Sequence, residues 1–228
     1  MAAHTKLWYL ERFRMLDVVP AHQRQVVEKM TRMLEVKRGQ RIYIHGDPSD
    51  QVFLLKAGVV KIARLGPRQQ ETILAFLYPG DVFGELAIVD QSPRDHVAEA
   101  HEDTVLCALS RDLVIRIAQE APALGYHITK VMGQRVKRLE TRLSELLGKG
   151  AAARVAHTLV ELAEAYGVPD AAGVLVPLRL SQSDIGNLVG LTRETVNIVL
   201  QDFRQRGLVL AERRAIRIAD MAGLRAVS

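Results

Sequence analysis

Two short helices predicted near the C-terminus carry polar side chains that can hydrogen-bond to nucleic acid. The first begins at Ser181, with Asp184 completing a capping box three residues later. The second begins after Thr192, a further helix cap, and Gly190 lies at the turn between them. Two helices about a glycine turn indicate a helix-turn-helix, whose second helix enters the DNA major groove with its N-terminal residues.

The second helix opens on Arg193 and Glu194, whose side chains match the edges of base pairs. A guanidinium group can donate two hydrogen bonds to guanine O6 and N7, and a carboxylate can accept one from cytosine N4. The alternative is a solvated surface pair. Four other polar residues lie near helix starts, where amide groups and the helix dipole favour phosphate: Ser181, Gln182, Thr192 and Thr195.

The residues around this motif predict how it is held. Apolar residues on one face of the second helix pack it onto its domain: Val196, Val199, Leu200 and Phe203. Downstream, Leu208–Leu210 and Ala215–Ile218 flank Glu212-Arg213-Arg214, which predicts a hairpin that serves as a wing. Five arginines around the helix end and the wing either contact phosphate or are solvated: Arg204, Arg206, Arg213, Arg214 and Arg217.

A long helix is predicted from about Ala123 to Leu147. Its apolar residues are spaced four, three, four and three apart, which is a heptad seam: Met132, Val136, Leu139, Leu143 and Leu146. The seam favours a two-helix dimer contact over the alternative, an amphipathic helix lying on its own domain. Gly148-Lys149-Gly150 then predicts a hinge.

The region from Arg32 to Asp112 has short apolar runs separated by Gly and Pro turns, which predicts an antiparallel sandwich or barrel. Short helices are expected near Ala21–Met33 and after Ser110. The fold class is therefore α+β, with an N-terminal jelly-roll-like β-roll, a long dimerisation helix and a C-terminal winged helix-turn-helix. The predicted domains are residues 1–122, 123–150 and 151–228. The runs are Arg41–Ile44, Val52–Leu55, Val59–Ala63, Thr72–Leu77 and Val105–Leu109.

Composition excludes several classes of protein. The single cysteine, Cys107, lies in an apolar run and is expected to be buried, so it supports no disulfide framework, iron–sulfur cluster or zinc finger. No apolar run approaches the length of a membrane span, and no signal peptide is evident, so we expect an intracellular, cytoplasmic protein. The net charge of +5 indicates an anionic partner. Six basic and two acidic residues between Lys130 and Lys149 hold most of it, so the motif rather than the charge locates the DNA site.

These motifs resemble the CRP/FNR family of bacterial transcription regulators along nearly the whole chain. Residues 79–87, with Pro93-Arg94, resemble the phosphate-binding cassette of the cyclic-nucleotide-binding roll, and residues 186–196 are close to the family's helix-turn-helix signature. The resemblance implies a homodimer that binds a pseudo-palindromic operator in double-stranded DNA. It also implies an activator, with the loop Gly167–Gly173 located where family members touch RNA polymerase.

The resemblance is incomplete at the third base-reading position, where the family usually has an arginine and this chain has Ile198. Either the neighbouring Asn197 reads a base instead, or Ile198 contacts a thymine methyl group. The half-site is therefore expected to differ in part from the commonest family sequence.

The family's cyclic-nucleotide pocket is also only partly present. The resemblance implies that Arg94 holds the phosphate and Glu85 the ribose, with the backbone near Gly84 around the ring. Asp95 follows Arg94 where binders carry a small residue, and its carboxylate would repel phosphate and could pair with Arg94. Leu139 and Glu140 replace the Thr–Ser pair that receives adenine. No cofactor is certain: the alternatives are no ligand, a different effector or cyclic AMP. Haem has no recognisable ligand pattern, although His45 and His96 stay open as ligands.

Rival functions have weaker sequence support. A cupin-type enzyme shares the roll but needs paired His and Glu metal ligands, whereas His45 stands alone and His96 and His101 are five apart. No Ser-His-Asp, Walker or kinase signature is present, so no catalytic or metal site is expected and the chain is not expected to be an enzyme. A nucleotide-sensing subunit that does not bind DNA is the rival that the helix-turn-helix disfavours. Membrane-surface binding lacks a basic amphipathic helix.

Overall fold

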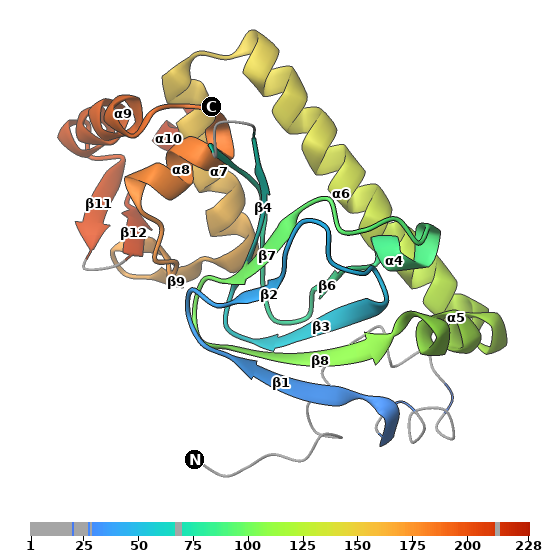
Figure 1. The fold of residues 1–228 in the computed structure, drawn as a ribbon. Helices are drawn as coiled ribbons and strands as arrows, with labels where there is room; N and C mark the ends of the chain where they lie inside the picture. The colour runs from blue at the N-terminus through green and yellow to red at the C-terminus, as the bar shows by residue number, and fades with distance from the viewer. Residues whose placement is uncertain (1–19, 21–26, 28, 67–69, 213–214) are drawn as a thin grey trace. The chain divides into compact units, whose positions relative to one another are not determined.

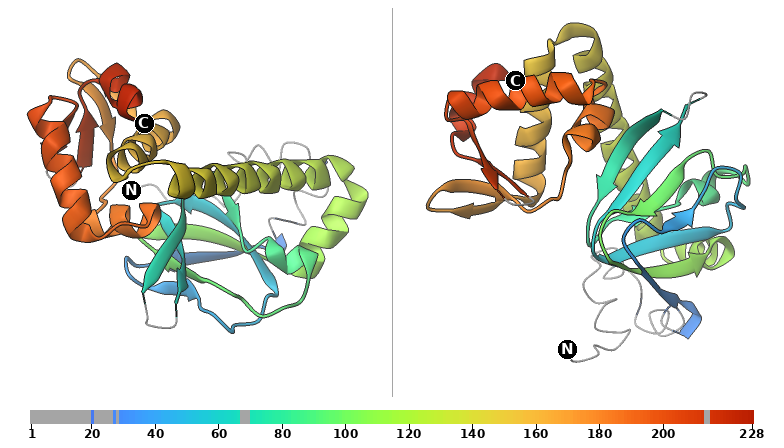
Figure 2. Two further views of the ribbon diagram at one scale, coloured as in Figure 1. Left: turned by 90° about the horizontal axis from the view of Figure 1, so that it is seen from above. Right: turned by 60° about the vertical axis from the view of Figure 1, so that its left-hand side comes forward.

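The computed structural model describes residues 20, 27, 29–66, 70–212 and 215–228 (Figure 1). The chain divides into two compact units, residues 1–135 and 136–228. The boundary lies within α6 (Pro122–Gly148), which is one unbroken helix (Figure 2). Strands and helices are both present and all strand pairs are antiparallel, which confirms the predicted α+β class.

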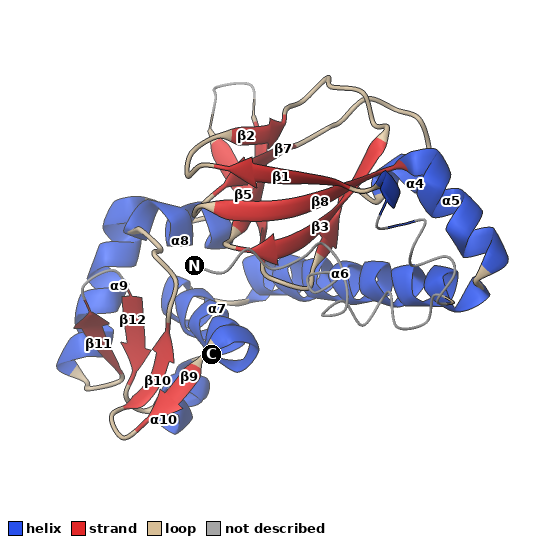
Figure 3. Ribbon diagram, turned by 90° about the horizontal axis from the view of Figure 1, so that it is seen from below, coloured by secondary structure: helices blue, strands red, loops and turns tan. Residues whose placement is uncertain are grey.

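The first unit contains two four-stranded sheets (Figure 3). One has the order β1-β8-β3-β6 and the other the order β2-β7-β4-β5. The short α4 (Leu86–Val89), α5 (Arg111–Glu120) and the first half of α6 accompany them. The strands of the unit are β1 (Arg32–Val36), β2 (Arg41–Tyr43), β3 (Gln51–Ala57), β4 (Val60–Leu65), β5 (Glu71–Leu77), β6 (Val82–Phe83), β7 (Val97–Ala100) and β8 (Thr104–Ser110).

The central strand β3 is apolar at every position from Val52 to Leu55 because both of its faces are covered. Phe53 and Leu55 belong to the core shared by the two sheets, and the Phe53 and Phe83 rings stack with centroids 5.0 Å apart. Val52 and Leu54 point to the other face, where they pack with α5 and the start of α6. Cys107 on β8 is fully buried in this second cluster, as predicted.

The predicted strands match β2 to β5 and β8 to within two residues at either end, and α5 follows Ser110, whose hydroxyl accepts a hydrogen bond from the Leu113 amide. The strands β1, β6 and β7 and the helix α4 were not predicted individually. The predicted helix near Ala21–Met33 is wrong at its end, because Met33 lies in β1 and pairs with Cys107. Residues 21–26 and 28 of that prediction lie outside the described residues.

The predicted hinge coincides with a break in the helices. α6 ends at Gly148, and α7 (Ala151–Tyr166) begins with Gly150 as its N-cap. Beside the break, the buried Glu145 carboxylate lies 3.2 Å from Nζ of Lys149 and 2.8 Å from Nδ1 of His157. An ion pair and a histidine thus link the last turns of α6 to α7.

In its described residues, the second unit places α7 and three later helices beside a small antiparallel sheet, in addition to the second half of α6. The helices after α7 are α8 (Gln182–Val189), α9 (Arg193–Gln205) and α10 (Met221–Val227). The sheet has the order β11-β12-β10-β9. The predicted wing is β11 (Val209–Glu212) and β12 (Ala215–Ile218). The segment expected as a loop instead contributes β9 (Val168–Asp170), which pairs with β10 (Gly173–Val176) and doubles the sheet.

Candidate nucleic-acid interface and effector pocket

The predicted helix caps of the helix-turn-helix are present. The Ser181 hydroxyl accepts a 3.0 Å hydrogen bond from the Asp184 amide, and the Ser181 amide donates a 2.8 Å bond to the Asp184 carboxylate. Thr192 accepts from the amide of Thr195 at 3.2 Å and starts α9 in the same way. Because these bonds satisfy amide groups that no helix can pair internally, both helices begin at defined residues.

Two glycines determine the angle between α8 and α9. Gly190 ends α8 in the left-handed conformation, with φ of 68°, which side chains rarely adopt. At Gly186 a Cβ atom would lie 2.6 Å from the carbonyl oxygen of Leu191, so a side chain there would push the turn away from α8. From α7, the Arg154 Nη1 donates to the Val189 carbonyl oxygen at 3.0 Å and fixes the end of α8.

The two faces of α9 differ as the sequence predicted. Val196, Val199, Leu200 and Phe203 are at most 9% exposed and hold the helix on the unit. Arg193 and Glu194 are exposed at the opening of the helix. A guanidinium group and a carboxylate on adjacent residues thus lie where they can reach hydrogen-bonding groups of a partner.

Asn197, predicted as a third reading residue, is partly buried and bonded to a second predicted contact residue. Nε2 of Gln182 on α8 donates a 2.8 Å hydrogen bond to Oδ1 of Asn197 on α9. The bond joins the first turn of α8 to the second turn of α9. Ile198, the next residue, is 66% exposed.

Arg217 is engaged within the sheet rather than solvated. Its guanidinium group pairs with Asp170 and donates a 2.6 Å hydrogen bond to Glu212, and only 12% of its side chain is exposed. The hydrogen bond from Arg217 holds the pKa of the Asp170 carboxyl below its usual value. Arg206 is paired with Asp202 one turn before it at 3.2 Å, whereas Arg204 is exposed. Arg213 and Arg214 lie outside the described residues.

In the first unit, Arg94 lies against Gly84, the residue before Glu85. The buried Arg94 donates from Nη1 to the Gly84 carbonyl oxygen at 3.0 Å and from Nη2 to that of Gln51 at 2.5 Å. Its guanidinium carbon lies 4.5 Å from the centre of the Tyr43 ring. A Cβ at Gly84 would lie 2.9 Å from the Gln51 oxygen and 3.0 Å from Nη1 of Arg94, so this contact requires glycine.

Arg135 on α6 joins the cluster of Gly84, Glu85 and Arg94. Its Nη1 donates a 2.5 Å hydrogen bond to Oε1 of Glu85, and its Nη2 donates to the Val82 carbonyl oxygen. Glu85 is only 7% exposed, so its charge would be costly without this partner. The sequence prediction missed Arg135, although it lies one helical turn before Leu139, a residue already considered for the pocket.

Asp95 does not pair with Arg94, a pairing that the sequence left open. The Asp95 carboxylate instead pairs with Arg64 and lies 2.5 Å from Nδ1 of His96. Nε2 of His96 lies 2.8 Å from the Tyr43 hydroxyl. The hydrogen bond from His96 holds the pKa of Asp95 below its usual value, and burial raises the pKa of Tyr43. Because Arg64 on β4 supplies a counter-charge, Asp95 has a partner outside the Arg94 group.

The Arg94 guanidinium group is suited to bind an anion. Nε of Arg94 is buried and has no hydrogen-bond partner among the residues that the structure describes, and a phosphate oxygen is an acceptor that would satisfy it. Leu139 and Glu140, also predicted for the pocket, lie in the part of α6 that belongs to the second unit, where both are exposed.

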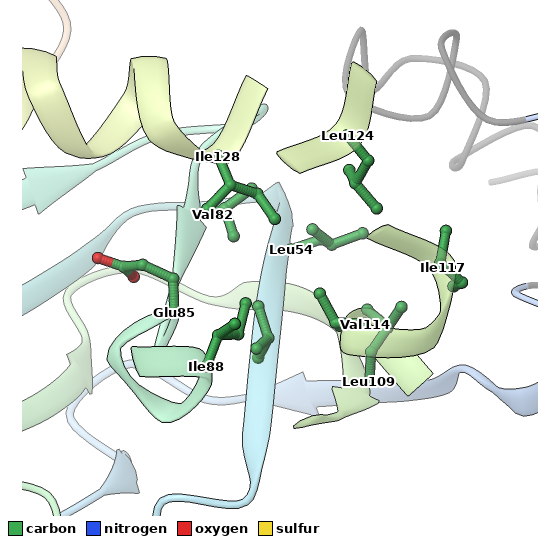
Figure 4. Close-up of a pocket in the computed structure, with 10 residues that line it drawn as sticks. Leu54, Val82, Glu85, Ile88, Leu109, Val114, Ile117, Leu124 and Ile128 are labelled. Atoms are coloured by element: carbon green, nitrogen blue, oxygen red, sulfur yellow. The ribbon is translucent and has the colours of Figure 1, made fainter. Parts of the chain in front are cut away.

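A cavity of about 20 Å³ lies behind Glu85 (Figure 4). Its other lining residues are apolar, and the Glu85 carboxylate points away from them (Figure 4). A space of this size holds about one water molecule, so the cavity is a packing defect of the core and not a nucleotide site. The lining residues are Val52, Leu54, Val82, Glu85, Ile88, Leu109, Val114, Ile117, Leu124 and Ile128.

Within the described part of the chain, no three His, Cys, Asp or Glu side chains are grouped to hold a metal ion. His45 is exposed, and His96 is engaged as described above. Among the described helices, none has the length and apolar character needed to cross a membrane.

Comparison with known proteins assigns a family to each unit. The cyclic nucleotide-binding domain family matches residues 33–121, and the Crp-like helix-turn-helix domain family matches residues 153–227. The "CRP-like cAMP-activated global transcriptional regulator" of Mycobacterium tuberculosis is 31% identical over 192 residues, which are 84% of this chain and 86% of that protein. The "Global nitrogen regulator" of Synechococcus elongatus is 27% identical over 83% of this chain and 86% of its own length.

The similarity extends to solved structures. The structure of FixK2 from Bradyrhizobium japonicum matches with a TM-score of 0.77 and 26% identity, covering 86% of this chain and 96% of that one. The similarity thus covers the β-sheet unit and the helix-turn-helix unit together.

Proposed function

The chain belongs to the CRP/FNR family of transcription regulators, whose members carry a helix-turn-helix DNA-binding domain, and we propose that it acts as a homodimeric, sequence-specific regulator of transcription. The observation that carries the proposal is the exposure of Arg193 and Glu194 at the opening of α9, opposite the buried face of that helix. These two side chains would read base edges in the major groove. The protein would act where the chromosomal DNA lies, in the cytoplasm.

Phosphate contacts would position the reading helix. Ser181, Gln182, Thr192 and Thr195 all lie in the first turns of α8 and α9 or at their caps, where helix dipoles favour an anion. These contacts would set the register of the protein on DNA and carry no base preference of their own. Arg204 is exposed at the far end of α9 and would add electrostatic attraction.

The second half of α6 supports a dimer. Four residues of its heptad seam are 48–58% exposed in the single chain: Val136, Leu139, Leu143 and Leu146. A second copy of the helix would bury them as a coiled coil, and two-fold symmetry would then pair two DNA half-sites. In this proposal residues 1–122 are a sensor, residues 123–150 form the dimer helix and hinge, and residues 151–228 bind DNA.

We propose activation through contact with RNA polymerase as the output. The hairpin of β9 and β10 is exposed from Val168 to Ala172, and it corresponds to the loop for which family resemblance implies this contact. Arg217 anchors the hairpin through Asp170, so the turn would be presented in a defined position.

We infer that operator binding does not require a nucleotide. Arg94 is held by two carbonyl oxygens and the Tyr43 ring, and Arg135 neutralises Glu85, so the pocket is already ordered by its own side chains. The second candidate is a cyclic-AMP-responsive regulator. It is favoured by one observation, the unpartnered buried Nε of Arg94, and by the name of the Mycobacterium tuberculosis relative.

The test is binding of the full-length chain to a library of genomic promoter fragments, with and without cyclic AMP and cyclic GMP. The first proposal predicts that the same fragments are retained in all three conditions, and that Arg193→Ala abolishes their enrichment. Retention only with cyclic AMP, lost again in Arg94→Gln, would replace it with the second candidate. Absence of enrichment in every condition would contradict DNA binding itself.

A further inference from the structure

Ile198 is an exposed apolar residue on the polar face of α9. It is 66% exposed, whereas Val196 and Val199 on either side of it are 0% and 9% exposed. Ile198 follows Glu194 by four residues, so the two side chains lie one turn apart on the same face of the helix. An isoleucine left in water at this position contributes nothing to the core of the unit.

The neighbouring Asn197 is committed elsewhere. Its side-chain oxygen accepts the 2.8 Å hydrogen bond from Gln182, and the residue is partly buried between the two helices. Asn197 therefore serves to join α8 and α9, and the side chain that continues the exposed row after Arg193 and Glu194 is Ile198.

The major groove presents one apolar group to a protein, the C5 methyl of thymine. An isoleucine side chain packed against a base cannot form hydrogen bonds with the amino or carbonyl groups of the other bases. Those groups would lose their bound water without gaining a hydrogen-bond partner. We propose that Ile198 is a specificity-determining residue, which selects a thymine in each half-site by packing against its C5 methyl group. This inference depends on the proposed DNA-binding function and adds the identity of one base.

The experiment tests the effect of the thymine C5 methyl group alone. A duplex recovered with the full-length chain from a randomised pool is resynthesised with each thymine replaced in turn by deoxyuridine, which removes only the methyl group. Fluorescence anisotropy then gives the dissociation constants of the wild-type chain, Ile198→Ala, Ile198→Val and Val89→Ala. Val89 is a matched control, since it is 65% exposed on α4 in the first unit, outside the reading helix.

For wild type, loss of the contacted methyl group in one half-site is expected to weaken binding about fourfold, the value of one buried methyl-sized group. Ile198→Ala should bind the thymine and deoxyuridine duplexes equally, whereas Ile198→Val and Val89→Ala should retain the discrimination. The inference is overturned if no thymine shows this pattern, or if Ile198→Ala discriminates as wild type does. A pool that yields no bound duplex overturns the proposed function along with it, so the two failures are distinct.

Discussion

The side-chain amide of Gln182 donates a 2.8 Å hydrogen bond to the side-chain oxygen of Asn197, joining α8 to α9. Sequence interpretation assigned these residues to different tasks, a phosphate contact and a base contact. Their bond makes them one structural unit that lies beside Arg193, Glu194 and Ile198. The orientation of the reading helix thus depends on a polar contact between the helices as well as on the buried apolar face.

Arg193→Ala is expected to weaken binding to the cognate duplex by about 1–3 kcal/mol and to relax preference at one base position in each half-site. The reason is loss of a bidentate contact with guanine. Equilibrium binding to a panel of single-base-pair substitutions measures both effects. If the variant retained the wild-type preference at every position, Arg193 would not be a base reader. Arg225→Ala is a charge-matched control, because Arg225 lies on α10 and pairs with Glu164.

Ser181→Ala is expected to reduce the free energy of unfolding by about 1 kcal/mol, through loss of the cap on α8. Ser181→Thr keeps a hydroxyl that accepts from the Asp184 amide and donates to the Asp184 carboxylate, so it should recover most of that loss. Urea denaturation followed by circular dichroism provides the measurement. Equal stability of the wild type and Ser181→Ala would mean that the capping box does not stabilise the unit.

Leu143→Glu is expected to convert the proposed dimer to a monomer. Leu143 is 58% exposed in the single chain and lies at the centre of the seam, where pairing would bury it. Losing that burial costs about 2 kcal/mol per protomer, before the repulsion between two facing carboxylates is counted. Sedimentation velocity measures the change, with Lys137→Glu, on another face of α6, as the control. A wild-type chain that sediments as a monomer would contradict the dimer.

Because of Lys56, we expect the free energy of unfolding to rise at alkaline pH. Burial lowers its pKa from 10.5 to about 8. Between these two values the unfolded chain binds more protons than the folded chain, so the free energy of unfolding rises with pH across this range. Lys56→Met should raise the stability at pH 7 and remove that rise.

Urea denaturation at pH 7 and pH 10 measures the effect of Lys56, with the exposed Lys29→Met as control. The same rise with pH in Lys56→Met and in wild type would show that another group is responsible.

The features predicted from sequence are those determined locally. The caps at Ser181 and Thr192 depend on residues three apart, and the burial of Phe203 follows from the helical period. Helix capping and helical periodicity involve residues within one or two turns of each other, so they can be recognised in a single sequence.

The features that sequence did not reveal join distant segments. Arg135 is bonded to Glu85, which is 50 positions away in the sequence, and Asp95 is paired with Arg64, which is 31 positions away. The partner of a charged side chain depends on which strands become neighbours. The sequence left open a pairing of Asp95 with its neighbour Arg94. In the structure Arg94 instead donates to the carbonyl oxygens of Gly84 and Gln51, and Asp95 pairs with Arg64.

The proposed DNA-reading function is tested by selection of DNA duplexes from a randomised pool by the full-length chain, followed by sequencing of the bound fraction. We expect an inverted repeat whose half-site centres are about one helical turn apart, with a conserved thymine in each half-site. Arg193→Ala should recover a less defined repeat. A bound fraction without any enriched sequence, or with a motif that lacks inverted symmetry, would contradict a two-fold DNA-reading regulator.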